Sequence, residues 1–304
     1  MFAKRKRKNF HQISRGPEIA IAVFFGLFSL ACFVPFLLVI VASFTDESTL
    51  IQNGYTLFPE KYSLNAYIYI FKVGKQILRS FGVTIFITVI GTTLSLIVTS
   101  FYSYALTRPK FIFRKFFNYA AFFTMLFTGG LVPTYLVVTR VLGLGNTIWA
   151  LILPLLMNAF YIIVMRTFFK TTIPESIIEA AHIDGAGEFR TFLKIVVPIS
   201  LPSIATIALF TTLAYWNDWF QALLYIDSAE YMPIQYLMMK IESQMQFLIQ
   251  NADAIGSSAI SIADLPAETL RMAIVVISTV PIACAYPFFQ KYFVKGLTVG
   301  SVKG

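Results

Sequence analysis

The sequence predicts an all-α membrane protein with six transmembrane helices. Of its 304 residues, 57% are hydrophobic and only 13% are charged, and the mean hydropathy is +0.73, which is typical of a chain whose main solvent is lipid. The apolar residues form long continuous stretches, each close to the ~20 residues that a helix needs to cross a bilayer. A β-barrel would instead show alternating segments of about 10 residues, so helices are favoured.

Six apolar stretches are bounded by charged or turn-forming residues. They are Ile19–Ser43, Val83–Leu106, Phe116–Val138, Ile148–Phe169, Ile199–Tyr225 and Met272–Phe289. We therefore expect a transmembrane domain over residues 19–293, with a basic tail over 1–18 before it and a short tail over 294–304 after it. The third stretch contains Gly129, Gly130 and Pro133, and the sixth contains Pro281 and Pro287. We expect these residues to interrupt both helices.

The distribution of positive charge predicts the orientation. Most of the 24 Lys and Arg residues fall in four regions: the N-terminal tail, the second-to-third connection, the fourth-to-fifth connection and the C-terminal tail. Positively charged loops stay on the cytoplasmic side, so both termini are expected in the cytoplasm (N-in/C-in) of a multi-pass cell-membrane protein. Because these residues flank apolar spans, the net charge of +9 indicates contact with membrane lipid and not with nucleic acid.

The sequence lacks the residues that several functional classes of protein require. Cys32 and Cys284 lie within apolar stretches, where a thiol behaves as a small hydrophobe, and His11 and His182 are too far apart to suggest a metal site. The only acids at the spans are Glu18 and Asp218, which disfavours an ion-coupled transporter. We expect no catalytic, cofactor or metal site. No G-x-x-x-x-G-K-[ST] loop occurs, so any ATP and Mg²⁺ would be bound by a partner subunit.

The connection between the fourth and fifth spans, residues 171–197, differs from a simple loop. Thr172 and Glu175 have the spacing of a capping box, which predicts a helix that begins near Glu175. Gly185 can adopt the left-handed conformation that ends a helix. A second short helix is expected near Gly187. The sequence thus predicts a helix, a glycine turn and another helix on the cytoplasmic side.

The connection contains Glu179-Ala180-Ala181-His182-Ile183-Asp184-Gly185-Ala186, followed by Ile195-Val196-Val197-Pro198 and Pro202. These residues resemble the EAA loop of ABC importer permeases, with Val197 where leucine often precedes the proline. Three further segments are Gly129–Tyr135, Trp216–Phe220 and Tyr286–Gly296. They extend the resemblance over essentially the whole chain, to the LplC-type carbohydrate permeases, relatives of the maltose permease MalG.

The resemblance implies a permease subunit that forms half of a translocation pathway and inserts a coupling helix into a groove of an ATPase. The ATPase-coupling residues implied are Glu179, Ala180, Ala181, Asp184, Gly185 and Ala186. The implied partners are a second homologous permease, two ATP-binding subunits and an extracytoplasmic solute-binding protein. The implied substrate is a carbohydrate, commonly an oligosaccharide. An importer of amino acids or peptides remains the alternative, because the coupling loop does not report the substrate.

A candidate substrate pathway lies near the extracytoplasmic end of the fifth span. Its residues are Trp216, Asn217, Asp218 and Trp219. Polar side chains at this depth often mark pathways, and tryptophan rings suit the apolar faces of sugars. The same residues also fit an interfacial aromatic belt, so both interpretations stay open. The hydroxyl residues of the second span are expected to pack helices together; they are Thr84, Thr88, Thr92, Ser95 and Thr99.

Overall fold

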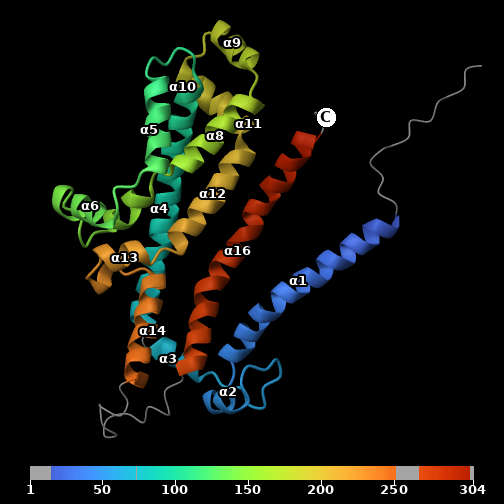
Figure 1. Cartoon of the computed structure of the whole chain (residues 1–304), viewed down its shortest axis with the longest axis vertical. Helices are drawn as coiled ribbons and strands as arrows, with labels where there is room; N and C mark the ends of the chain where they lie inside the picture. The colour runs from blue at the N-terminus through green and yellow to red at the C-terminus, as the bar shows by residue number, and fades with distance from the viewer. Residues whose placement is uncertain (1–14, 73, 251–266, 302–304) are drawn as a thin grey trace, which may run out of the picture. The chain divides into compact units, whose positions relative to one another are not determined.

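A computed structural model describes residues 15–72, 74–250 and 267–301 of the chain. Within these ranges the regular structure is helical, apart from one antiparallel bridge between Thr45 and Tyr62. The predicted basic tail up to residue 14 lies outside the described residues. The chain separates into two compact units, which are treated in turn: unit 1 comprises residues 1–68 and 265–276, and unit 2 comprises residues 69–264 and 277–304 (Figure 1).

Unit 1 contains α1 (Arg15–Ser43), α2 (Glu47–Asn53), the start of α3 (Asn65–Lys72) and the start of α16 (Ala267–Ser301). Large apolar side chains of α1 are exposed all around the helix, among them Phe24, Phe28 and Leu30. A helix that is hydrophobic on every side suits a lipid environment. After α1 the chain turns back at the Thr45–Tyr62 bridge.

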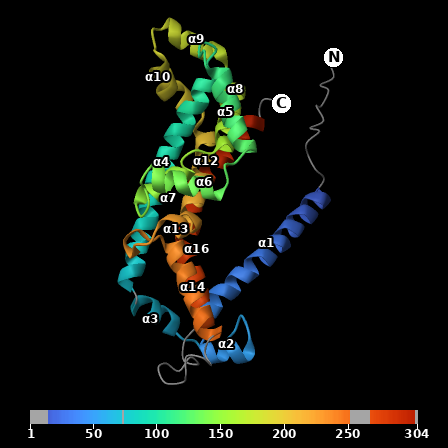
Figure 2. The same cartoon turned by 60° about the vertical axis from the view of Figure 1, so that its left-hand side comes forward.

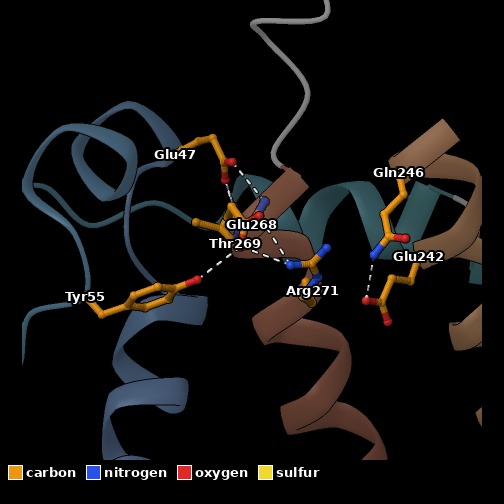
Figure 3. A network of polar contacts seen from close by, with 7 residues as sticks. All are labelled: Glu47, Tyr55, Glu242, Gln246, Glu268, Thr269 and Arg271. Atoms are coloured by element: carbon orange, nitrogen blue, oxygen red, sulfur yellow. Dashed lines mark hydrogen bonds and ion pairs between the residues drawn. The ribbon is translucent and has the colours of Figure 1, made fainter. Parts of the chain in front are cut away.

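The carboxylate of Glu47 caps the beginning of α16 (Figure 3). Its Oε1 accepts a hydrogen bond from the Glu268 amide at 2.9 Å, and its Oε2 accepts from the Thr269 amide at 2.9 Å and from the Thr269 hydroxyl at 2.6 Å. The first amides of a helix have no partner inside the helix, and the helix dipole favours an anion there. Tyr55 and Arg271 bind the Glu268 carboxylate beside this cap. The capping interaction holds segments more than 200 residues apart in the sequence.

Unit 2 is arranged around α4 (Gly74–Thr107), against which α5 (Arg114–Leu126), α8 (Ala159–Thr172) and α12 (Leu201–Trp216) pack (Figure 1). In both views α9 lies at one end of this unit and α14 at the other (Figure 2). The remaining elements are α6 (Leu131–Leu136), α7 (Ile148–Ile152), α9 (Glu175–Ile183), α10 (Glu188–Thr191), α11 (Val197–Ile199), α13 (Phe220–Tyr225) and α14 (Ile234–Gln250), with 3-10 or π turns at Val137–Val141, Leu153–Leu155, Phe192–Val196 and Ala229–Tyr231.

The predicted hydroxyl stripe of α4 is buried; it comprises Thr84, Thr88, Thr92, Ser95 and Thr99. The hydroxyl of Thr84 accepts from the amide of Ile234 at 2.8 Å, and the hydroxyl of Thr92 lies 3.4 Å from the hydroxyl of Thr212 in α12. These two residues support the prediction that the stripe joins helices, whereas the hydroxyls of Thr88 and Thr99 have no hydrogen-bond partner among the described residues. Outside the stripe, the hydroxyl of Ser103 donates to the carbonyl of Ile162 at 3.0 Å.

The ring of Tyr215 in α12 packs directly against Gly91 of α4. A Cβ atom at this position would lie 2.5–2.7 Å from ring atoms of Tyr215, a distance that no real side chain tolerates. The ring of Tyr215 is buried, and its hydroxyl donates to the carbonyl of Ile152 at 2.8 Å. A glycine in α4 is thus required for the packing of α4, α12 and the α7 segment.

The described helices include three that are long and apolar enough to cross a membrane, and three bent pairs that pass the same test together. By length and composition this allows up to six spans. The single helices are Gly16–Ser43, Gly74–Thr107 and Glu268–Pro287; the pairs are Arg114–Leu126 with Leu131–Val141, Ile148–Leu155 with Ala159–Thr172, and Glu188–Ile199 with Leu201–Trp216.

Three of the predicted spans differ from straight, single helices or from their expected ends. The third predicted span bends by 118° between Leu126 and Leu131, and Gly130 has φ +85° at this break. The predicted interruption of this span is confirmed. The fifth stretch was expected to run to Tyr225, but α12 ends at Trp216 and α13 is a separate short helix. The expected interruption of the last helix is wrong, because α16 continues through Pro281 and Pro287 to Ser301. Each proline removes one backbone hydrogen bond and need not end a helix in the membrane.

Replacing Gly91 by alanine is expected to destabilise the protein by about 1–3 kcal/mol, because the new methyl group must displace the ring of Tyr215. Gly82→Ala is the matched control: it lies in the same helix with open space around it, and alanine there is expected to be neutral or slightly stabilising. Thermal unfolding of the detergent-purified protein measures both. Adding Tyr215→Leu should reduce the cost of Gly91→Ala. Equal effects at the two glycines would contradict the close approach.

Candidate coupling loop and pathway residues

The predicted helix–turn–helix between the fourth and fifth apolar stretches is present. α8 ends at Thr172, the chain is extended at Ile173 and Pro174, and α9 runs over Glu175–Ile183. The predicted capping box is wrong, because Thr172 is the last residue of α8, and no side chain caps the start of α9. Proline disfavours a helical conformation at the residue before it, so Ile173 separates the two helices and Pro174 occupies the capping position.

The end of α9 forms a Schellman motif around Gly185. The Ala186 amide donates to the carbonyl of Ala181 at 2.9 Å, and the Gly185 amide donates to the carbonyl of His182 at 3.0 Å. Gly185 has φ +79°, a left-handed conformation that is strained for residues with a Cβ atom. The prediction that Gly185 ends this helix in a left-handed turn is confirmed.

α9 has an inner face that packs and an outer face that is free within the described chain. On the inner face, Ile178 and Ala181 are buried, and Ile178 belongs to an apolar cluster that also contains Phe169 of α8 and Phe192. Ala186, beyond the turn, is half-buried. The outer face carries exposed Glu179, Ala180, Ile183, Asp184 and Gly185.

Ile183 is the most exposed apolar residue of this loop, with 86% of its surface accessible. It lies next to the exposed acid Asp184. An apolar side chain flanked by carboxylates and small residues fits a partner surface better than it fits water. The only sequence signal for this residue is an isoleucine within a polar connection.

A set of polar contacts connects α9, α10 and α4. His182 Nδ1 lies 3.0 Å from the carbonyl oxygen of Ala186, and its Nε2 lies 3.4 Å from Oε1 of Glu188. The other oxygen of Glu188 accepts a hydrogen bond of 2.5 Å from the hydroxyl of Tyr104 in α4. The ring of Tyr104 also packs against Phe192, with centroids 5.0 Å apart. The loop is therefore anchored to the end of α4, and no sequence signal pairs Tyr104 with a residue 84 positions away.

A groove with a volume of about 390 Å³ lies between α9 and the following helical segment. Ala180 and Ala181 of α9 line one side, and Arg190 and Lys194 line the other. The small side chains of α9 leave this space open. Asp184 also lines the groove, opposite the two cations, so the lining carries charges of both signs and suits a polar partner surface.

The four candidate pathway residues do not form one cluster of exposed side chains. Trp216 is buried, and its indole N–H donates to the carbonyl of Ser278 in α16 at 2.9 Å. Asn217 and Trp219 are exposed. Trp216 thus joins two helices of unit 2, whereas Asn217 and Trp219 remain accessible to a ligand.

Asp218 lies in the break between α12 and α13. Its Oδ1 accepts from the amide of Gln221 at 3.3 Å, which stabilises the start of α13. Its Oδ2 is buried and has no hydrogen-bond partner among the described residues. A buried acceptor without a donor is unusual in a folded protein, so this oxygen remains available for a ligand or a water molecule.

The apolar helices, the broken spans and the exposed helix–turn–helix together indicate a polytopic membrane protein with an exposed helical loop. Residues 81–299 match the family described as binding-protein-dependent transport system inner membrane component, and this chain belongs to that family. It is therefore a permease component of an ABC importer and a multi-pass protein of the cytoplasmic membrane.

Individual relatives cover nearly the whole chain. It is 42% identical to the polygalacturonan/rhamnogalacturonan transport system permease protein YtcP of Bacillus subtilis (strain 168), over 94% of this chain and 98% of that protein. It is 39% identical to Protein LplC of the same organism, over 94% and 95%. Among solved structures, a chain of a bacterial ABC transporter involved in the import of the acidic polysaccharide alginate is similar at 31% identity, with a TM-score of 0.77, over 93% of this chain and 99% of that chain.

Serine at position 185 is expected to loosen the coupling loop, because its Cβ atom strains the left-handed backbone by about 1–2 kcal/mol. Gly187→Ser is the matched control: Gly187 has φ −72° and precedes α10, where serine is a favourable cap. Hydrogen exchange of the 175–190 peptide should be roughly 5–30-fold faster in Gly185→Ser than in Gly187→Ser. Equal exchange would show that the turn does not need a glycine.

Proposed function

We propose that this chain is one of two permease subunits of an ATP-driven carbohydrate importer. It spans the membrane six times, with both termini and the coupling loop in the cytoplasm. Three long apolar helices and three bent pairs support six spans, and the distribution of Lys and Arg supports the orientation. The observation that carries the proposal is the anchored loop with a free outer face, in a chain of the ABC importer permease family.

The proposed substrate is an oligosaccharide, with acidic glycans as the first candidates. The similar permease YtcP is named for polygalacturonan and rhamnogalacturonan, and the similar solved transporter is described for alginate. Another relative, 29% identical, is named for arabinooligosaccharides. These names favour a carbohydrate over the alternative of amino acids or peptides.

The outer face of α9 is proposed to dock in a groove of an ATP-binding subunit. Glu179 and Asp184 supply carboxylates, Ala180 and Gly185 permit a close approach, and Ile183 supplies an apolar contact. Ala181 and Ala186, which the family resemblance also assigns to coupling, contribute by supporting the helix from its inner side.

The complete transporter is proposed to contain this permease, a second similar permease, two ATP-binding subunits and an extracytoplasmic solute-binding protein. ATP and Mg²⁺ are proposed to bind to the ATP-binding subunits, and this chain is proposed to be a non-catalytic membrane subunit. The family description, an inner membrane component of a binding-protein-dependent system, supports this division of roles.

Co-expression with the neighbouring transport proteins followed by purification tests this proposal. The complex is reconstituted in vesicles, and ATP hydrolysis is measured with uronate-bearing oligosaccharides, neutral oligosaccharides, amino acids and peptides. Stimulation by an oligosaccharide is expected. Stimulation by amino acids or peptides alone would contradict the carbohydrate assignment, and uptake by this chain without an ATPase would contradict the whole proposal.

Charge reversal or an added charge on the outer face of α9 is expected to detach the ATPase. Glu179→Lys places a cation where a donor is expected, and Ile183→Asp buries an unpaired carboxylate at the interface; each should weaken docking by several kcal/mol. Glu60→Lys, the same change at an exposed glutamate of unit 1, is the control. Co-purification of the ATPase and uptake in vesicles are measured. Parental values in both assays for both loop variants would show that the loop is only a connector.

Substitutions at the candidate pathway residues are expected to have two kinds of effect, one on the uptake rate and one on stability. Trp219→Ala should lower the uptake rate by roughly tenfold, because an exposed ring that stacks on sugar is lost, and should leave stability unchanged. Trp216→Phe should lower stability by about 0.5–1.5 kcal/mol, because the hydrogen bond to Ser278 is lost. Trp149→Ala, at another exposed tryptophan, is the control for uptake. Unchanged uptake in Trp219→Ala would favour the aromatic-belt interpretation.

A further inference from the structure

Four cationic side chains line one small polar pocket that lies outside the coupling loop and the break after α12. The pocket has a volume of about 190 Å³ and lies where α4 ends, α5 begins and α8 ends. Arg114 and Lys115 come from the first turn of α5, and Arg166 and Lys170 come from the second half of α8. Two helices thus bring together two pairs of cations that are more than 50 residues apart in the sequence.

The described part of the chain supplies no anion to this pocket. None of the four cations forms an ion pair with a described residue, and the Nε of Arg166 is buried without a hydrogen-bond acceptor there. Like charges that share a pocket repel one another, and a buried donor without an acceptor costs free energy. Both costs are removed by one anionic group with several acceptor oxygens.

An apolar surface adjoins the basic pocket. A second cavity of about 130 Å³ is lined by Tyr102, Phe111 and Phe117, and it shares Leu106 with the basic pocket. On α5, Phe122 and Met125 are exposed, with 49% and 48% of their surfaces accessible. They follow Asn118, which lines the basic pocket, by four and seven residues, so they lie on the same side of the helix as the pocket. A ligand that contacts both the basic pocket and the apolar surface therefore has an anionic head and apolar tails.

We infer that this pocket binds the phosphodiester headgroup of an anionic membrane lipid, with its acyl chains along the exposed apolar side of α5. Guanidinium groups match phosphate oxygens in geometry and charge, and basic pockets between transmembrane helices suit anionic headgroups. The bound headgroup joins α5 to the end of α8. Because α8 leads through Thr172 into the coupling loop, the lipid also stabilises the base of that loop. The inference depends on the proposed orientation only for the choice of the cytoplasmic leaflet.

Native mass spectrometry of the complete transporter, purified with its partner subunits, tests this inference. The probes are dioleoyl-phosphatidylglycerol and dioleoyl-phosphatidylcholine. In Arg166→Gln/Lys170→Gln, the affinity for phosphatidylglycerol is expected to fall roughly twentyfold, while retention of phosphatidylcholine stays unchanged. Arg140→Gln/Lys240→Gln, which removes two exposed cations elsewhere in unit 2, should bind phosphatidylglycerol like the parent.

A second variant separates loss of charge from loss of fold. Arg166→Lys/Lys170→Arg keeps both charges and should retain most of the phosphatidylglycerol affinity; equal loss in this variant would overturn the electrostatic assignment. Phosphatidylglycerol binding that is unchanged in the glutamine variant would overturn the site. Displacement of the lipid by inorganic phosphate, at an ionic strength matched with chloride, would assign the pocket to a soluble anion. Loss of a partner subunit with unchanged lipid binding would assign it to an acidic protein surface.

Discussion

The close approach of α12 to α4 at Gly91 is the constraint on which the rest of unit 2 depends. Lipid provides no hydrophobic driving force for helix association, so packing in the membrane relies on small residues and on hydrogen bonds between helices. Gly91 leaves room for the ring of Tyr215, whose hydroxyl then reaches the carbonyl of Ile152. The hydroxyl of Ser103 reaches α8 in a similar way. α4 thereby becomes the common support of the neighbouring helices.

The same helix supports the coupling loop. Near its end, Tyr104 donates to Glu188, and Glu188 lies beside His182 of α9. Ile178 is held in the apolar cluster, and the Schellman motif fixes the direction of the chain at Gly185. These contacts hold α9 at both ends within unit 2 and leave its outer face exposed.

The break after α12 shows how one short sequence can serve two purposes. Trp216 connects α12 to α16 through its hydrogen bond to Ser278, while Trp219, three residues later, is exposed. The chain leaves the helix between them, so residues that are neighbours in sequence point into different environments. One oxygen of the Asp218 carboxylate accepts a hydrogen bond from the Gln221 amide, and the other has no hydrogen-bond partner among the described residues.

The sequence by itself determined the helical class, the apolar stretches, the glycine turn at Gly185 and the family resemblance, because hydrophobic length and backbone preference are local properties. The same local reasoning failed at Thr172, since its side chain could cap α9 only if α8 ended earlier, and at Pro281 and Pro287, because a helix can continue past a proline within the membrane. Only the tertiary structure decided that Ala181 is buried, that Ile183 is exposed, that Tyr104 holds Glu188 and that four cations share a pocket. Such features depend on which segments meet in space. Contacts between residues 50 or more positions apart cannot be predicted from the local pattern of a single sequence.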